Sequence, residues 1–149
     1  MFRGLHTLTL DSKGRMSIPA RLREKLREPS DGRVVLTIDV DRCLLIYPFD
    51  EWERVEEKLT RLPTINKEAR RLQRLLLGHA EECEIDAQGR VLVSPQLRGF
   101  AQLGRRVALV GQGRKLELWD EERWLGLREE LLGDGDGESL SGALENLVI

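Results

Sequence analysis

The chain has 149 residues, of which 40% are hydrophobic and 34% are charged, and its formal net charge is −2. This length fits one medium-sized domain or two small related ones, and the near-neutral total excludes a protein that attracts nucleic acid by its overall charge. No segment approaches the ~20 apolar residues of a membrane span, and charged residues interrupt the first apolar stretches. We therefore expect a soluble cytoplasmic protein with neither a signal peptide nor a membrane helix.

Charge is distributed unevenly along the chain. Residues 1–28 carry seven basic and three acidic side chains, a net charge of +4, whereas residues 117–149 carry two basic and ten acidic ones, a net charge of −8. Solvated helix faces contribute to such a difference. Beyond that, it predicts two faces with different partners, or two faces that attract each other in an oligomer.

The first predicted elements flank a charged turn at residues 11–15, Asp-Ser-Lys-Gly-Arg. Short alternating apolar runs precede and follow it, which predicts a β-hairpin. Gly14 is suited to the left-handed position of the turn, and the Asp11 carboxylate is placed to accept hydrogen bonds from the turn amides. Lys13 and Arg15 are then left to point outward from a rigid tip.

Further elements follow in chain order. They are a short helix at 21–26, a second hairpin formed by residues 34–40 and 43–47, a helix at 49–62 and a connecting helix at 65–78. We expect Asp50 to be the N-cap of the helix at 49–62, and Trp52 and Leu59 to lie on its apolar stripe. The connecting helix is expected to pack either on both halves of the protein or on another subunit.

The charged turn occurs a second time, at residues 86–90 (Asp-Ala-Gln-Gly-Arg), displaced by 75 residues. Beyond it the displacement is 72, which pairs Val107 with Val35 and Trp124 with Trp52. Each copy is too small to bury a core alone, so the two copies are expected to pack around a pseudo-twofold axis. The expected parts are a first repeat at 1–62, a connecting helix at 63–80, a second repeat at 81–132 and a flexible acidic tail at 133–149, which ends in a weak helix or in disorder.

Residues that carry catalytic chemistry are sparse. Cys43 and Cys83 have no partners at metal-ligand spacing and are expected to be ordinary buried or half-buried thiols. Neither His6 nor His79 has an obvious catalytic partner, and there is no glycine-rich phosphate loop. We therefore expect no cofactor and no metal, and we do not expect an enzyme.

The motifs and their order resemble those of a known family. They are Met1-Phe2-Arg3-Gly4, both Asp-x-x-Gly-Arg turns, Ile18-Pro19 with Leu22-Arg23, and Tyr47-Pro48 with Trp52. Over about residues 1–132 the sequence resembles the MraZ family, whose halves are each similar to a swapped-hairpin DNA-binding domain of the AbrB type. The resemblance implies an α+β, mostly β fold: a tandem swapped-hairpin (AbrB-like) β-barrel with pseudo-twofold symmetry and flanking helices.

The same resemblance implies a function. It points to a sequence-specific transcriptional regulator of the gene cluster for division and cell-wall synthesis. Such a regulator binds double-stranded DNA at short direct repeats upstream of its own operon, assembles as a ring-shaped homo-oligomer, and works in the cytoplasm at the nucleoid.

The DNA contacts are expected at the first turn. A two-stranded β-ribbon fits the major groove, where an arginine binds guanine O6 and N7 bidentately. We expect Arg15 to make such a base contact and Lys13 to bind phosphate. Arg3, Arg21 and Arg23 are either secondary contacts or solvated surface charges.

The second turn has the same frame but fewer cations. Asp86 and Gly89 shape it as Asp11 and Gly14 shape the first, but Ala87-Gln88 replaces Ser12-Lys13. Arg90 either binds DNA too or belongs to a half that mainly completes the fold, and we favour unequal roles with Arg15 dominant. The alternative function is an antitoxin-like protein-interaction module that also binds DNA and captures its partner with the acidic tail.

Overall fold

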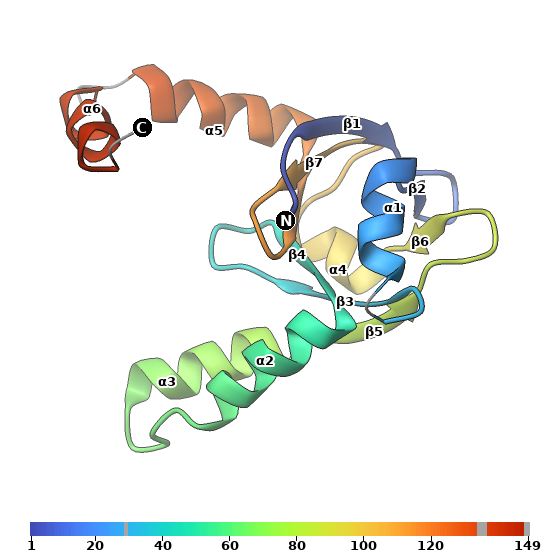
Figure 1. The fold of residues 1–149 in the computed structure, drawn as a ribbon, viewed down its shortest axis with the longest axis horizontal. Helices are drawn as coiled ribbons and strands as arrows, with labels where there is room; N and C mark the ends of the chain where they lie inside the picture. Colours follow the sequence, from blue (N-terminus) through green and yellow to red (C-terminus); the bar gives the residue numbers. More distant parts are fainter. Residues whose placement is uncertain (29, 134–136, 148–149) are drawn as a thin grey trace.

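Two antiparallel sheets lie at the centre of the molecule, and helices flank them (Figure 1). The computed structural model describes residues 1–28, 30–133 and 137–147. The strands are β1 (Leu5–Thr9), β2 (Arg15–Ser17), β3 (Arg33–Ile38), β4 (Leu44–Pro48), β5 (Glu81–Glu84), β6 (Arg90–Leu92), β7 (Arg106–Gly111) and β8 (Leu116–Asp120). The helices are α1 (Ala20–Arg27), α2 (Phe49–Thr60), α3 (Lys67–Leu72), the π-helix η1 (Gln73–Leu77), α4 (Pro95–Phe100), α5 (Glu121–Gly133) and α6 (Gly137–Asn146).

The strands of the two sequence halves are interleaved. The larger sheet has the order β1-β7-β8-β4-β3-β5, and β2 pairs with β6 in a second, two-stranded sheet. Leu5 of β1 lies opposite Val110 of β7, and Leu36 of β3 lies opposite Glu81 of β5. The hairpin predicted around each charged turn is therefore wrong, because the strands on either side of a turn find their partners in the other half. The mixed α+β architecture is confirmed, but the pairings of the described residues do not close a barrel.

The hairpin predicted at residues 34–47 is confirmed. β3 pairs with β4, and the amide of Arg42, whose φ is 62°, donates to the Asp39 carbonyl at 3.0 Å. α2 follows β4 directly, with Pro48 as its N-cap, so the prediction of Asp50 as the cap is wrong. Proline fixes φ near the value that the chain needs to leave the strand, and the helix begins at Phe49, the first residue of the predicted range. The Asp50 amide instead donates to the Ser30 hydroxyl at 3.1 Å.

The connecting segment begins as an α-helix and continues as a π-helix. It begins at Lys67, after Asn66, whose side chain accepts hydrogen bonds from two amides of the first turn. From Gln73 it continues as the π-helix η1, and the buried Thr37 hydroxyl of β3 donates to the Leu76 carbonyl at 2.6 Å. Its main contacts are with α2 and β3. Ile65, expected in this helix, precedes it and is 92% exposed.

The core consists of two clusters, one on each face of the larger sheet. The main cluster fills the space between the two sheets and the helices α1 and α4. The second lies on the opposite face, where α2, η1 and the start of α5 pack. Trp52 and Trp119 are buried in this second cluster, and the burial of Trp52 agrees with the apolar stripe predicted for its helix.

Strands β3 and β7 correspond to each other in the two halves, but their residues match with a displacement that differs by one from the predicted value. Val34 of β3 lies opposite Pro48, and Val107 of β7 lies opposite Asp120. Val107 therefore corresponds to Val34 and not to Val35, a displacement of 73 in this strand. A one-residue slip moves a side chain to the other face of a sheet. Accordingly, Val34 and Val107 belong to the main cluster and Val35 to the second.

The acidic end of the chain is only partly described. Residues 134–136 of the expected linker lie outside the described residues. α5 and α6 lie on either side of this gap, and α5 extends away from the sheets (Figure 1). In the ranges that the structure describes, no helix combines the length and the apolar character that crossing a membrane requires.

Candidate nucleic-acid interface

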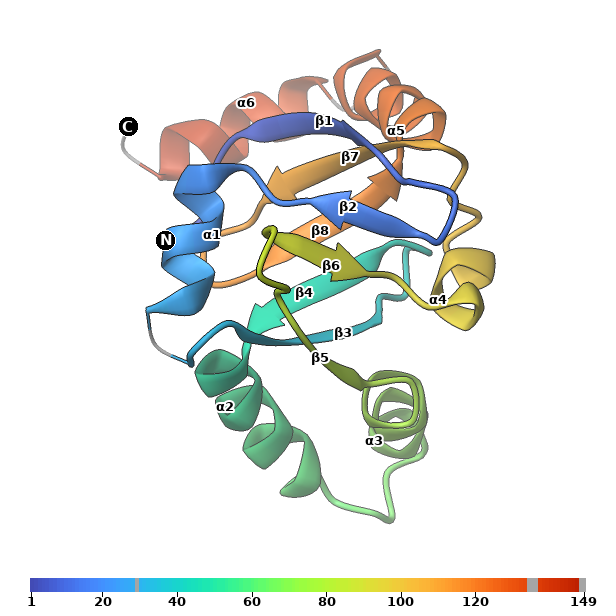
Figure 2. The same cartoon turned by 90° about the vertical axis from the view of Figure 1, so that its right-hand side faces the viewer.

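The two charged turns lie at opposite ends of the β2–β6 ladder, on one side of the molecule (Figure 2). Met16 lies opposite Val91 at the centre of this ladder, and both side chains are buried. Successive side chains of a strand alternate between its faces, so Arg15 and Arg90 both face outward, one from each end. From strand spacing, their Cα atoms lie about 8 Å apart. The fold thus brings together the two arginines that the sequence singled out.

In the first turn, one carboxylate holds both the backbone and the arginine. Asp11 Oδ1 accepts hydrogen bonds from the amides of Lys13 and Arg15, both at 2.9 Å. Asp11 Oδ2 accepts from Arg15 Nε at 2.7 Å. The pKa of Asp11 is lowered to about 2, chiefly by the hydrogen bond from the Arg15 amide. The Arg15 side chain and the Lys13 amide lower this pKa further, whereas desolvation raises it. Asp11 therefore holds both the turn backbone and the Arg15 guanidinium.

The second turn repeats this geometry. Asp86 Oδ1 accepts from the amides of Gln88 at 2.9 Å and Arg90 at 2.8 Å, and Oδ2 accepts from Arg90 Nε at 2.9 Å. The pKa of Asp86 is lowered, again chiefly by the backbone hydrogen bond from Arg90. The two turns therefore differ in the cation at one exposed position, where Gln88 replaces Lys13.

Each turn is braced by an arginine from the other half. Gly14 has φ of +86°, and a β-carbon there would lie 2.7 Å from Arg98 Cζ and 2.9 Å from the Val93 carbonyl oxygen. At Gly89, where φ is +80°, a β-carbon would lie 2.7 Å from Arg23 Cδ. Arg98 Nε also donates to the Val93 carbonyl at 3.0 Å. Both glycines are thus required by backbone conformation and by the side chain that lies over them.

The remaining predicted cations are dispersed. Arg23, predicted as a secondary contact or a solvated surface charge, lies against the second turn. Arg21 is exposed on the same helix, α1. Arg3 precedes β1 whereas the first turn follows it, which separates Arg3 from Asp11 by about 25 Å along the chain. The structure therefore does not bring Arg3 to the first turn.

Three further arginines lie at the turns and were missed by sequence reasoning. Arg98 and Arg105 line a hollow beside Asp11. Arg27 Nη2 donates to the Asp86 carbonyl at 3.2 Å. A signal existed for Arg98, because the internal repeat pairs it with Arg23, whereas nothing in the sequence distinguished Arg27 or Arg105 from other surface arginines.

The described part of the chain contains one group of three side chains close enough to share a metal ion, Asp39, Cys43 and Glu117. The Asp39 carboxylate accepts hydrogen bonds from the Asp41 amide and the Cys43 thiol. Glu117 accepts one from the indole of Trp119 at 3.0 Å. These polar groups are satisfied by protein partners, so the cluster has a structural explanation and gives no reason to assign a metal.

Comparison with known proteins places this geometry in a family context. A family model described as "MraZ protein, putative antitoxin-like" matches the chain twice, at residues 1–75 and 76–135. A relative from Thioalkalivibrio sulfidiphilus is 53% identical over the full length of both chains. Relatives from Methylococcus capsulatus (51% identity over 94% of this chain and 92% of that protein) and Coxiella burnetii (49% over all of both) are also similar. All three relatives are named "Transcriptional regulator MraZ".

Proposed function

Because this chain belongs to the MraZ family, we propose that it is a transcriptional regulator that binds double-stranded DNA in a sequence-specific manner. The observation that carries the proposal is the outward face of the β2–β6 ladder. Arg15 and Arg90 share that face, and a carboxylate fixes each guanidinium. Pre-organised donors of this kind lose little side-chain entropy when they bind.

The way Arg15 is held leaves it suited to read a base. Asp11 accepts from Nε of Arg15 and leaves the two terminal nitrogens available. Those two nitrogens are the donors that bind guanine O6 and N7 bidentately. The major groove is about 12 Å wide and admits a two-stranded β-ribbon, so a spacing of about 8 Å between Arg15 and Arg90 fits a single groove.

In this proposal the other cations contact the sugar–phosphate backbone of the DNA. Lys13 is exposed at the tip of the first turn, where it binds phosphate. Arg3, Arg21 and Arg23 contribute secondary contacts, and Arg15 dominates over Arg90 because the second turn has no lysine. Asp11, Gly14, Asp86 and Gly89 act by shaping the turns.

We further propose that the two halves form an AbrB-like swapped-hairpin unit about a pseudo-twofold axis, with a first repeat at 1–62, a connecting helix at 63–80, a second repeat at 81–132 and a tail at 133–149. Matching hydrogen bonds at a displacement of 75 support it. The Val93 amide donates to the Gly14 carbonyl at 2.9 Å, and the Ile18 amide donates to the Gly89 carbonyl at 3.0 Å. β4 and β8, which also correspond, pair with Leu45 opposite Glu117.

The proposed target is a set of short direct repeats upstream of the protein's own operon, in the gene cluster for division and cell-wall synthesis, bound at the nucleoid by a ring-shaped homo-oligomer. A few base contacts supply only part of the typical affinity of about 10⁻⁸–10⁻¹¹ M. Several subunits on repeated sites raise avidity by roughly 10²–10⁴ where the geometry allows. The proposal therefore links the ring-shaped oligomer to the direct repeats, because several subunits of one ring can bind repeated sites on one DNA molecule.

Selection of bound fragments from the organism's own genomic DNA tests the function. The expected result is enrichment of one region that contains short direct repeats, bound by the wild-type protein in gel shifts. Arg15→Ala should lose the shift while light scattering shows unchanged mass and far-ultraviolet circular dichroism shows an unchanged fold. Recovery of random fragments only, or a normal shift by Arg15→Ala, would contradict the proposal.

A second candidate function is favoured by the family description, which includes the term antitoxin-like. In that case the protein also captures a partner protein with its acidic C-terminal segment. A pull-down with the full chain and with a chain ending at residue 132 separates the two: a partner lost together with the tail supports the interaction module.

A further inference from the structure

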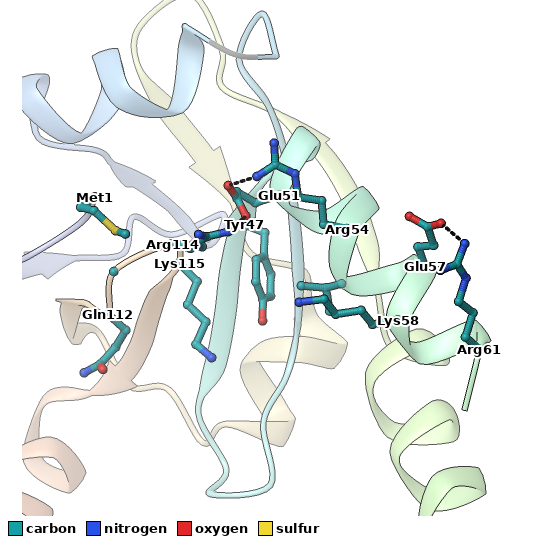
Figure 3. Close-up of a pocket in the computed structure, with 12 residues that line it drawn as sticks. Met1, Tyr47, Glu51, Arg54, Glu57, Lys58, Arg61, Gln112, Arg114 and Lys115 are labelled. Atoms are coloured by element: carbon teal, nitrogen blue, oxygen red, sulfur yellow. Dashed lines mark hydrogen bonds and ion pairs between the residues drawn. The ribbon is translucent and has the colours of Figure 1, made fainter. Parts of the chain in front are cut away.

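A basic hollow lies on the side of the molecule formed by α2 and the β7–β8 turn (Figure 3). Its volume is about 590 Å³. Arg54 and Lys58 of α2 and Arg61 just after it line one wall, and Arg114 and Lys115 line the other. Glu51 and Glu57 also line the hollow, which leaves five basic side chains against two acidic ones. The proposed DNA contacts involve none of these residues.

Within the described ranges, two lysines of the hollow have no acidic partner. Arg54 pairs with Glu51 at 3.1 Å and Arg61 pairs with Glu57 at 2.6 Å. Among the described residues, neither Lys58 nor Lys115 has a carboxylate within ion-pair distance. Figure 3 shows both lysine side chains reaching toward the phenol end of Tyr47 from opposite sides.

The floor of this hollow is partly apolar. Tyr47 and Val55 line it, and the Lys115 ammonium lies 6.0 Å from the centre of the Tyr47 ring. Aromatic and aliphatic surface between positive walls suits a segment that carries both leucines and carboxylates. A bare anion would use the walls and leave the floor uncovered.

The C-terminal helices have the complementary chemistry. From residue 128 to 145 the sequence contains one arginine against six acidic residues. α5 has no buried residue, and its contacts are chiefly with β7 and β8 at its start. Between residues 121 and 147, six leucines are 40–70% exposed: Leu125, Leu131, Leu132, Leu140, Leu144 and Leu147.

Leu140 and Leu144 are four residues apart on α6 and therefore share one helix face, and exposed apolar faces mark interaction surfaces. Glu129 and Glu130 directly precede Leu131 and Leu132 on the last turns of α5, so that acids and apolar side chains occur together. In Figure 1 this end of α5 points away from α2, and thus from the hollow of its own chain.

We propose that the acidic α5–α6 segment of one copy docks in the basic hollow of a second copy. The proposal rests on the self-association included in the proposed function, and it identifies the two surfaces that meet. Because the hollow and the segment are different surfaces, the contact is head-to-tail and closes into a ring if the rotation between copies permits.

Charge reversal tests this contact. The variant Lys58→Glu with Lys115→Glu opposes the acidic segment with like charge, and association is expected to weaken about tenfold or more. Sedimentation velocity should then show a shift from the wild-type oligomer toward monomer. Lys67→Glu reverses an exposed lysine outside the hollow and should leave the oligomer unchanged.

The decisive experiment restores the charge complementarity between the two surfaces. Glu129→Lys with Glu130→Lys should also dissociate the oligomer, and combining all four substitutions should restore it. A wild-type protein that is monomeric would overturn the proposal. So would a Lys58→Glu/Lys115→Glu variant that keeps the mass of the wild-type oligomer. Unchanged mass in every variant is also the result expected if the segment closes on its own chain or binds another protein, and it counts against docking between copies.

DNA binding distinguishes this proposal from the function on which it rests. The hollow variant should still bind a duplex with a single repeat as the wild type does, because its turns are intact. Loss of oligomer with retained single-site binding supports the docking. A wild-type protein that oligomerises through these surfaces but binds no DNA would overturn the proposed function and leave the docking supported.

Discussion

Replacement of Gly14 by alanine tests the geometry of the first turn most sharply. The residue has φ of +86°, where an alanine costs roughly 1–2 kcal/mol relative to glycine. The added β-carbon would also lie 2.7 Å from Arg98 Cζ and 2.9 Å from the Val93 carbonyl oxygen. Arg98 is a side-chain end and can swing away, but Val93 is backbone and its amide donates to the Gly14 carbonyl.

The expected loss is therefore the conformational cost plus about 1 kcal/mol of overpacking, in total about 2–3 kcal/mol of unfolding free energy. For a chain of this size that corresponds to a melting temperature lower by about 5–10 °C. Thermal melts by circular dichroism at fixed protein concentration measure it. Adding Arg98→Ala removes one of the two overlaps, so the double variant should lose less than the sum of the single losses.

Gly126→Ala is the matched control. Gly126 lies inside α5, and a β-carbon there would meet nothing within 4 Å. Alanine in a helix interior is favoured over glycine by roughly 0.5–1 kcal/mol, so this variant should melt at or slightly above the wild-type temperature. If Gly14→Ala melted like the wild type, or no lower than Gly126→Ala, the reasoning about the turn would be refuted.

Four further predictions address charge and packing. Because the pKa of Asp11 is lowered to about 2 in the folded state, the unfolded chain binds more protons between about pH 4 and pH 2, and stability should fall as the pH falls through that range. Asp11→Asn should flatten this part of the melting-temperature profile, and an unchanged profile would contradict the assignment. Lys13→Ala should reduce the slope of log affinity against log salt by about 1, because it removes one phosphate contact; an unchanged slope would exclude that contact. Arg98→Ala should speed hydrogen exchange of the Gly14 amide and weaken DNA binding by about tenfold, since it unbraces a turn that supplies a base contact; normal exchange would show that Arg98 is not a brace. Burial raises the pKa of the Cys83 thiol to about 12, so at pH 8 it should react with a disulfide reagent at least about a hundredfold more slowly than in denaturant; rapid reaction of the folded protein would contradict its burial.

Local features of the fold were readable from the sequence because their causes are local. The Asp-x-x-Gly-Arg pattern specified the turns, since the aspartate bonds to amides two and four residues later and the glycine takes a positive φ. The apolar stripe of α2, with Trp52 and Leu59 buried, followed from helical periodicity. The thiols of Cys43 and Cys83 are buried and half-buried as predicted.

The features that the sequence did not disclose depend on distant parts of the chain. Alternation around the first turn indicated strands but not their partners, and β1 pairs with β7, about a hundred residues away in sequence. The one-residue error at Val107 arose because the turn after β3 (residues 39–43) is one residue longer than the turn after β7 (residues 112–115). A slip of one residue exchanges the two faces of a strand. Arg98 reaches Gly14 only because the halves interleave. The site was therefore predicted as a turn with two cations, whereas the folded site is a ladder face built from both halves.

The central claim is that Arg15 reads DNA and outweighs Arg90 on the face that they share. Titration of the selected operator with Arg15→Ala and Arg90→Ala, at one salt concentration and with equal oligomer mass, measures it most directly. A lost bidentate guanine contact is worth roughly 1–3 kcal/mol, so Arg15→Ala should bind about 5–150-fold more weakly per site, and Arg90→Ala only a few-fold more weakly. Equal losses in the two variants would contradict the claim of unequal roles, and normal binding by Arg15→Ala would contradict the account itself.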